Sequence, residues 1–422
     1  MSVPGREMGR WRGPFCDCPG GEYGPVVVCP RRDEPDVDCV PTPTRRQGLA
    51  QVSDPDSEQP FVRYRDRLWS RPPVDLVRRL DEAVADVSGR RLAVSPLVDA
   101  TVLAAATDRP GIRLVAKDET GQPTGSHKIR HLFGLALHLL VEVPDAHRRL
   151  AIASCGNAAL AAATVARAAG WRLEVFVPPD AHPAVLAELD ALAAEIVTCP
   201  RGAPGEGDPC YHRFREAVDA GALPFATQGP DNALTIDGGR TLGWELAEQT
   251  VAGACVPQDV FVQVGGGALA ASLAAGWREA GPAPARFHAV QTSGVAPLAR
   301  AARVVAERAA RHGVGPAMAW AVRHRGEVMW PWESVAPSCA TGILDDETYD
   351  WAAVVDAVLS SGGSFGEAGE AALRRANGLV VDELGIVADE TGTAGVAGFI
   401  GRLPQLTDGS TAAVLLTGAR RG

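Results

Sequence analysis

The sequence predicts an α/β fold in which mainly parallel strands are covered on both faces by helices. From residue 112 onward, short apolar runs alternate with longer segments whose apolar residues recur every three or four positions. The first pattern is typical of buried strands and the second of amphipathic helices. Their alternation is typical of parallel sheets. A chain of 422 residues also exceeds one simple core and suits two or three domains.

The expected elements follow one another with short connections. Strands are expected at residues 112–116, 150–153, 173–177, 196–198, 260–264, 287–291 and 411–416. Helices are expected at residues 129–141, 158–169 and 183–194. Ligands of such folds bind at the carboxyl ends of the strands, so the loops that follow the strands are where we expect the chemistry.

Composition excludes several classes of function. Apolar residues make up 46% of the chain and charged residues 22%, which is ordinary for a globular protein. The net charge of −10 gives no broad basic surface, so we expect no nucleic-acid partner. No run approaches the roughly 20 apolar residues of a membrane span. The first residues lack the apolar stretch of a secretory signal, so we expect no membrane partner and a cytoplasmic location.

Residues 1–58 are rich in Pro, Arg, Gly and Asp, which predicts a poorly ordered extension that the rest of the chain does not need. Four of the nine cysteines lie there. Cys16 and Cys18 are separated by one residue, and Cys29 and Cys39 by nine. Zinc sites usually use pairs separated by about two to four residues. We therefore expect no metal site, with a zinc site as the alternative.

The segment Lys117-Asp-Glu-Thr-Gly-Gln-Pro-Thr-Gly-Ser-His-Lys128 joins a predicted strand to a predicted helix. Lys128 opens the helix, where the positive end of the helix dipole disfavours the charged ammonium. A neutral amine is the form that attacks a carbonyl to give an imine. The alternative is a solvated lysine on a helix surface.

Two further loops also join a strand to a helix. Ser154-Cys155-Gly156-Asn157 offers backbone amides to a carboxylate and the Asn157 amide to an oxygen atom. Val264-Gly265-Gly266-Gly267 lets the backbone approach a phosphate, and its spacing fits neither a dinucleotide site nor a nucleotide P-loop. Either loop could instead be an ordinary tight turn. Thr417 ends the last strand, where its hydroxyl can make one buried hydrogen bond or simply terminate the strand.

The order and spacing of these motifs resemble those of fold-type II enzymes that use pyridoxal 5'-phosphate (PLP), the tryptophan-synthase-β-like group. Asn157 follows Lys128 by 29 residues, and Gly267 follows Asn157 by 110. The resemblance implies two open, mainly parallel sheets with the cofactor in the cleft between domains. It also implies a homodimer. The smaller domain would comprise residues 115–225, and the larger one residues 59–114 plus 226–422.

The resemblance also assigns roles to residues. Lys128 would form the imine with PLP and catalyse proton transfer. Asn157 would bind the phenolic oxygen, and Thr417 would face the ring nitrogen. The phosphate would be held by Gly265, Gly266, Gly267, Ala268 and Leu269, with His127 as a further donor unless a backbone carbonyl satisfies that ring. The carboxylate of an amino-acid substrate would bind to Ser154, Cys155, Gly156 and Asn157.

Within that group the chain is most similar to threonine synthases. Arg63-Tyr64-Arg65, Pro123-Thr-Gly-Ser-His-Lys128 and Gly238-Gly-Arg-Thr-Leu-Gly-Trp-Glu245 resemble their motifs. The sequence departs from that pattern at His127, Ile129 and Cys155. A histidine before the lysine is typical of tryptophan synthase β chains, and Ile-Arg after it is closer to threonine dehydratases.

The expected activity is therefore that of a lyase acting on an amino acid. The first candidate is a threonine-synthase-like conversion of phosphohomoserine to threonine and phosphate. The second is a threonine or serine dehydratase, which releases ammonia, or a β-replacement synthase on the same scaffold. The third is a PLP-binding relic without turnover, although the lysine, the Asn157 loop and the glycine loop are all retained. The departures beside Lys128 predict a weak reaction with phosphohomoserine.

Overall fold

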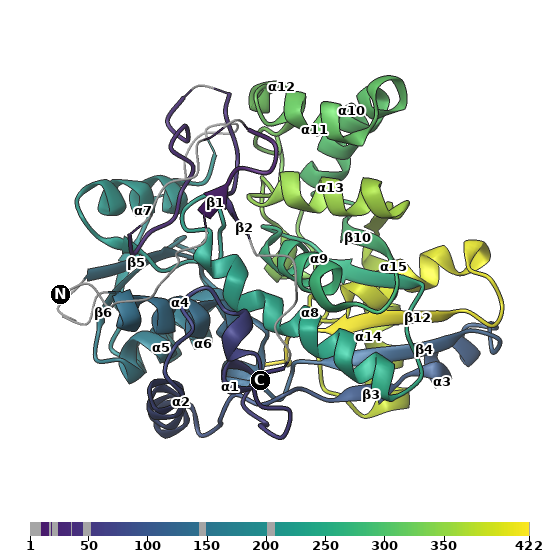
Figure 1. Cartoon of the computed structure of the whole chain (residues 1–422), viewed down its shortest axis with the longest axis horizontal. Coiled ribbons are helices and arrows are strands. Elements are labelled where there is room, and N and C mark those ends of the chain that lie inside the picture. Colours follow the sequence, from purple (N-terminus) through teal and green to yellow (C-terminus); the bar gives the residue numbers. More distant parts are fainter. Residues whose placement is uncertain are drawn as a thin grey trace.

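The protein is described by a computed structural model covering residues 10–16, 18, 24–34, 36–44, 52–142, 149–200 and 207–421. Two sheets form its centre (Figure 1). One has six strands in the order β11-β10-β9-β12-β4-β3, and the other has four in the order β7-β6-β5-β8. All pairings within these two sheets are parallel except that of β3 with β4. The predicted fold class, two open and mainly parallel sheets under helices, is confirmed.

Each predicted strand overlaps one in the structure. The six-stranded sheet comprises β3 (Leu97–Asp99), β4 (Arg113–Asp118), β9 (Asp259–Gln263), β10 (Arg286–Thr292), β11 (Ser364–Ala368) and β12 (Thr411–Leu416). The four-stranded sheet comprises β5 (Arg149–Ala153), β6 (Arg172–Val177), β7 (Glu195–Thr198) and β8 (Leu223–Pro224). Strands β3, β8 and β11 were not expected, because they are short and lack a buried apolar run.

Helices cover both sheets (Figure 1). The three predicted helices are α4 (Lys128–Glu142), α5 (Asn157–Ala168) and α6 (Pro183–Ala191). The other α-helices are α1 (Pro60–Arg63), α2 (Val74–Ser88), α3 (Thr101–Ala105), α7 (Pro209–Asp219), α8 (Leu234–Ala252), α9 (Ala268–Ala280), α10 (Pro297–His312), α11 (Val314–Ala321), α12 (Arg325–Val328), α13 (Trp351–Ser361), α14 (Glu370–Leu384) and α15 (Ala394–Arg402). Short 3-10 helices span Arg65–Arg67, Pro123–Gly125, Thr341–Ile343 and Leu403–Gln405.

Helix α8 joins the two halves of the molecule, since it lies between α4 and α9 (Figure 1). Helices α4 and α8 meet at Gly134 and Gly238. A Cβ on Gly134 would lie 2.6 Å from the Gly238 Cα, so a side chain there would force the helices apart. Glycine is therefore needed at this crossing. The crossing places the first turn of α4, which carries Lys128, directly against the buried face of α8.

Strand β4 belongs to the six-stranded sheet because it pairs with β12 and β3. The expected smaller domain, residues 115–225, would cut through this strand. A start of the smaller domain after β4 would keep the six-stranded sheet in one domain. The rest of the expected domain division stays a prediction.

The described part of residues 1–58 packs against the rest of the protein. Strand β1 (Arg10–Arg12) pairs with β2 (Thr42–Thr44), and Trp11 is 1% exposed and contacts Trp69 with ring centroids 4.9 Å apart. The Val27 amide donates to Asn232 Oδ1 at 3.1 Å. The described part of the extension is thus packed rather than loose, while its dispensability for cofactor binding stays a prediction. A few buried apolar side chains anchor this segment despite its polar composition.

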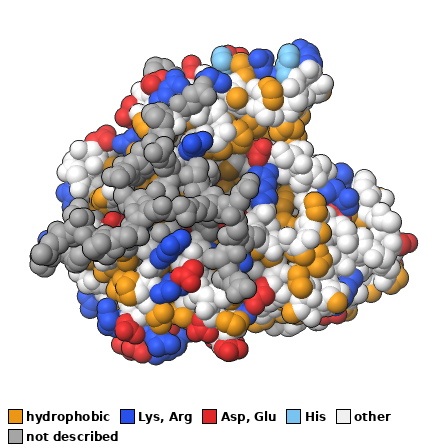
Figure 2. All heavy atoms as spheres, in the orientation of Figure 1, with side chains coloured by type: hydrophobic (Ala, Val, Ile, Leu, Met, Phe, Trp, Pro, Cys, Tyr) orange, Lys and Arg blue, Asp and Glu red, His pale blue; other side chains and the backbone are white. Residues whose placement is uncertain are grey.

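The surface carries charges of both signs. On the face shown in Figure 2, Lys and Arg side chains are interspersed with Asp and Glu among the described residues. Within the described ranges, no helix combines the length and the apolar character needed to cross a membrane.

Candidate active site

The predicted residues from three loops and the last strand gather at the carboxyl ends of the strands. Lys128 opens α4, Asn157 opens α5, and the glycines lie between β9 and α9. Residues 417–421 run antiparallel to residues 124–127: Ser126 and Gly418 form a β-bridge, and the Ala419 amide donates to the Gly125 carbonyl at 2.8 Å. This pairing places Thr417 beside the Lys128 loop, although the two lie far apart in sequence.

Lys128 is one of only two lysines in the chain, and the other is Lys117. Lys117 Nζ is fully buried and donates to the Ser95 carbonyl, to Glu245 and to Gln249 at 2.7–2.8 Å. Among the described residues, Lys128 Nζ makes one hydrogen bond, to Thr227 Oγ1 at 3.3 Å. Burial lowers the pKa of the Lys128 amine, while the charge of Asp345 opposes the shift. Lys128 is therefore the lysine that is available for covalent chemistry.

A buried network of charges lies beneath Lys128. Arg130 Nε donates to Glu119 at 2.6 Å, and Arg130 Nη1 donates to Glu245 at 2.6 Å. Lys117 shares the same Glu245 carboxylate. Burial raises the pKa of Glu245, but Arg130 and Lys117 outweigh it and hold the pKa below its ordinary value. The network ties the end of β4, the first turn of α4 and the middle of α8 together, which fixes where Lys128 stands.

Asn157 is oriented by the carboxyl end of the chain. Arg421 Nη2 donates to Asn157 Oδ1 at 2.9 Å and to the Thr124 carbonyl at 2.8 Å. Because Oδ1 accepts this bond, Nδ2 is left as the donor of the Asn157 amide. Sequence reasoning missed Arg421, since nothing local marks it as a partner of residue 157.

The Ser154–Asn157 loop precedes α5, whose first amides have no intrahelical acceptor. The Gly156 amide lies 3.4 Å from Ser154 Oγ. Cys155 is exposed to solvent. Neighbouring chain segments still shield the thiol in part from water, which raises the pKa of Cys155, and the charges of Asp208, Asp180 and Asp345 add to the increase. The charges of these residues therefore act on the loop that was predicted to bind substrate.

The glycine loop is enclosed by residues 343–350. Gly267 has a φ of +98°, and a Cβ on Gly265 would overlap with Asp345 Oδ2. The Gly266 carbonyl accepts from the Asp350 amide at 2.8 Å. Ala268 and Leu269 open α9, so the loop delivers free backbone amides and the positive end of a helix dipole. This arrangement suits a phosphate. Sequence reasoning missed the enclosing segment.

Thr417 is held by a residue that sequence reasoning missed. Gln263, the last residue of β9, donates from Nε2 to Thr417 Oγ1 at 2.5 Å. Since the hydroxyl oxygen accepts this bond, its own proton is free to be donated. A hydroxyl that donates matches an unprotonated ring nitrogen. A buried glutamine directly ahead of the glycine loop was the available signal.

His127 is buried, and its Nδ1 lies 3.2 Å from the Thr417 carbonyl. This is the carbonyl contact that was the alternative to a phosphate contact. Burial, helped by the charge of Lys128, lowers the pKa of His127 well below its ordinary value. Its Nε2 has no hydrogen-bond partner among the described residues. A phosphate dianion beside Nε2 would favour the doubly protonated ring, which donates from both nitrogens.

Other buried polar atoms near this point also lack partners among the described residues. They are Thr124 Oγ1, Ser126 Oγ, Gln263 Oε1 and Asp350 Oδ1. Buried polar atoms are normally hydrogen-bonded, and unsatisfied ones that gather in one place indicate a polar ligand. The residues present therefore fit an anionic, ring-bearing cofactor such as PLP.

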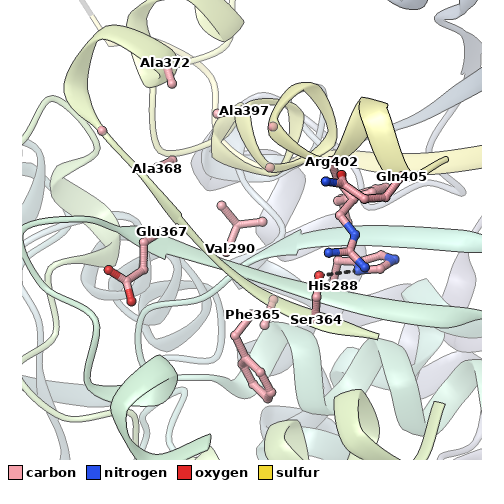
Figure 3. A pocket seen from close by; sticks show the side chains of 16 residues that line it. His288, Val290, Ser364, Phe365, Glu367, Ala368, Ala372, Ala397, Arg402 and Gln405 are labelled. Carbon is pink, nitrogen blue, oxygen red and sulfur yellow. Dashed lines mark hydrogen bonds between the residues drawn. The ribbon is translucent and has the colours of Figure 1, made fainter. Parts of the chain in front are cut away.

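A separate cavity lies away from these residues. It has a volume of about 290 Å³ and is lined by residues of β10, β11, α14 and α15 (Figure 3). His288 Nδ1 and Ser364 Oγ lie 2.7 Å apart in it, and Arg402 and Gln405 are close by in the same view. None of the predicted site residues lines this cavity.

Comparison with known proteins decides the family. Residues 91–418 match the pyridoxal-phosphate dependent enzyme family. The chain belongs to this family, and PLP is its cofactor. Among curated proteins, the tryptophan synthase beta chain of Mycobacterium intracellulare is 28% identical over 209 residues. That match covers 47% of this chain and 48% of the relative, so it spans about half the length of each.

Solved structures agree on the fold. A threonine deaminase from T.th. has a TM-score of 0.62 at 24% identity, covering 83% of this chain and 99% of that one. Maize serine racemase has a TM-score of 0.62 at 18% identity, covering 83% and 94%. The L-serine ammonia-lyase of Rhizomucor miehei has a TM-score of 0.60 at 18% identity, covering 78% and 94%. At these identities the likeness establishes the fold alone.

Proposed function

We propose that the chain binds PLP through Lys128 and eliminates the β-substituent of a small, uncharged amino acid such as serine or threonine. The products are a keto acid and ammonia. The observation that carries this proposal is the position of Asp345, which lies against Gly265 of the glycine loop and whose charge acts on both Lys128 and the Cys155 thiol. A carboxylate at this point favours an uncharged substrate side chain over an anionic one.

The assignment of Lys128 rests on the exclusion of Lys117 as well as on the position of Lys128. PLP binds covalently to a lysine amine in enzymes of this kind. Lys117 is enclosed by three hydrogen-bond acceptors and a fully buried ion pair. Lys128 stands at a helix start beside Thr417 and the glycine loop, with a lowered pKa that favours the free amine.

PLP supplies the electron sink that makes the Cα proton of the bound amino acid acidic. The chain does the rest. Lys128 Nζ would accept the Cα proton, while Thr417 Oγ1 and Asn157 Nδ2 would donate hydrogen bonds to the cofactor. The amides of residues 154–157 hold the substrate carboxylate. Burial raises the pKa of Asp345 to about 6, so this carboxyl can give a proton to a departing hydroxyl near neutral pH.

A threonine-synthase-like reaction is the second candidate. It is favoured by the motif Pro123-Thr-Gly-Ser-His-Lys128 and by Arg63 and Tyr64, which both bind Glu248 in α8. These two contacts tie the end of α1 to α8. They explain the motif structurally and give no preference for one substrate over another. Phosphohomoserine would bring a second phosphate close to Asp345, in addition to that of the cofactor, and the repulsion weighs against this substrate.

The test compares kcat/KM for serine and threonine with kcat/KM for phosphohomoserine on the holoenzyme. Keto acid and ammonia report elimination with deamination, and phosphate reports the synthase reaction. We expect the hydroxy amino acids to be preferred, and Asp345→Asn to narrow the preference, because it removes both the proton donor to the departing hydroxyl and one negative charge. A preference for phosphohomoserine of about a hundredfold, roughly 2.7 kcal/mol in transition-state binding, would overturn the proposal.

A further inference from the structure

Four cysteines from separate parts of the N-terminal segment converge on one point. Cys16 Sγ lies 2.7 Å from Cys18 Sγ and 3.9 Å from Cys29 Sγ, and the Cys18 and Cys29 sulfurs are 3.1 Å apart. The Cys39 thiol interacts with those of Cys16 and Cys29. All four side chains are buried, with exposures of 1–7%. The four residues form a cluster of their own, separate from the apolar cores.

The backbone is arranged around these sulfurs. A Cβ on Gly13 would overlap with Cys16 Sγ and lie 2.6 Å from Cys39 Sγ, so any side chain there would fill the space between them. The Cys18 amide hydrogen-bonds to Cys16 Sγ, and the Arg31 amide to Cys29 Sγ. Amide donors stabilise a sulfur in its thiolate form, which is the form that binds metals.

We propose that Cys16, Cys18, Cys29 and Cys39 bind one zinc ion as four thiolates. Sulfurs bound tetrahedrally at about 2.3 Å from zinc lie about 3.8 Å apart, so the closest pair needs to separate by roughly 1 Å. Protonated thiols are weak hydrogen-bond donors and would leave this buried point poorly satisfied. A closed site with four sulfur ligands is typical of structural zinc.

The spacing of the cysteines led to the opposite expectation, that of no metal site. That argument assumed ligands in two closely spaced pairs along the chain. Here the single-residue spacing of Cys16 and Cys18 is completed by Cys29 and Cys39, which the fold brings to the same point. The tertiary structure is therefore the reason to reverse the expectation.

The zinc would fix a segment that is connected through Asp38 and Trp351 to the glycine loop. The Asp38 amide donates to the Val322 carbonyl at 2.8 Å, and Trp351 Nε1 donates to Asp38 Oδ2 at 2.8 Å. Trp351 directly follows Asp350, whose amide binds the Gly266 carbonyl. Loss of the metal should thus weaken PLP binding as well as the fold. The proposal does not depend on which amino acid the enzyme uses.

The first test is elemental analysis of the wild-type holoenzyme, purified with reductant and dialysed against metal-free buffer. We expect one zinc per chain. An organomercurial that titrates thiols should release that zinc, and a chromogenic chelator should detect it. A protein that contains no zinc would overturn the proposal, as would cysteines 16, 18, 29 and 39 paired in disulfides or iron in place of zinc.

Variants locate the site. Cys16→Ser and Cys39→Ser should lower the zinc content at least about tenfold and lower the melting temperature and PLP affinity. Cys255→Ser is the matched control, because Cys255 is buried in the apolar core around α8 and α9, apart from the four-cysteine cluster, and the variant should retain full zinc. If the ligand variants do not fold, the organomercurial release on the wild-type enzyme still decides the matter. Full zinc content in both ligand variants would contradict the assignment.

Discussion

The predicted cofactor site and the N-terminal cysteine cluster are specified by the sequence in different ways. At the predicted cofactor site, Lys128, Asn157 and Gly267 each stand where a strand gives way to a helix, so the local pattern marks them. In the cluster, Cys16 and Cys39 belong to irregular backbone, and only the tertiary fold brings their sulfurs together. Residues at the ends of regular elements can therefore be found from local patterns, whereas residues in irregular backbone can be grouped only once the tertiary fold is known.

The largest effect on stability is expected for the buried charge network beneath Lys128, whose residues come from distant parts of the sequence. Glu245→Ala removes the carboxylate that both Arg130 and Lys117 bind, and it leaves two buried cations without this partner. We expect the free energy of unfolding to fall by about 3–5 kcal/mol, measured by denaturant titration of the holoenzyme. The control Glu216→Ala breaks an exposed ion pair with Arg213 and should cost about 0–1 kcal/mol. Equal losses of unfolding free energy in the two variants would show that the buried network does not stabilise the fold around Lys128.

A smaller effect is expected at the glycine loop, which the local pattern predicts to be the phosphate site. Gly266→Asp places a side chain 3.1 Å from Tyr349 Cδ2 and a negative charge beside the expected phosphate. PLP affinity should fall by about 1–3 kcal/mol, measured by titration of the apoenzyme with PLP. Gly378→Asp is the matched control, because a Cβ at that position in α14 meets no atom within 4 Å. Unchanged PLP affinity of the Gly266 variant would remove the phosphate from this loop.

The weakest expected effect is a pH dependence of stability from Asp350, which lies between the glycine loop and the N-terminal segment. Burial raises the pKa of Asp350 from 3.8 to about 8, although the Gly229 amide opposes the shift. Between these two values the folded protein binds more protons at this site than the unfolded chain. The contribution of Asp350 to stability is therefore greatest below about pH 4 and falls as the pH rises to about 8.

Asp350→Asn should remove this part of the pH dependence, with the difference between variant and wild type growing from pH 5 to pH 8. Thermal unfolding at several pH values measures it. A wild-type stability that rises over this range relative to the variant would contradict the buried, protonated carboxyl.

Much of the fold followed from sequence because the apolar runs of β5, β9 and β12 are continuous. The limits of prediction have physical reasons. Strand β11 (Ser364–Ala368) is half exposed and carries polar residues, so it has no buried run to detect. Asp345 and Arg421 lie in segments without a regular period, and they act on Lys128 and Asn157, which are far away in the sequence. The extension was expected to be loose because its composition is polar, yet a few buried apolar side chains suffice to anchor it.

Borohydride reduction of the holoenzyme is the most direct test of PLP binding at Lys128. Because Lys117 and Lys128 are the two lysines of the chain, peptide mass mapping of the reduced protein has to distinguish only these two. We expect the cofactor adduct on Lys128, an unmodified Lys117, and no adduct in Lys128→Ala. An adduct on Lys117, or a yellow protein in which neither lysine is modified after reduction, would contradict it.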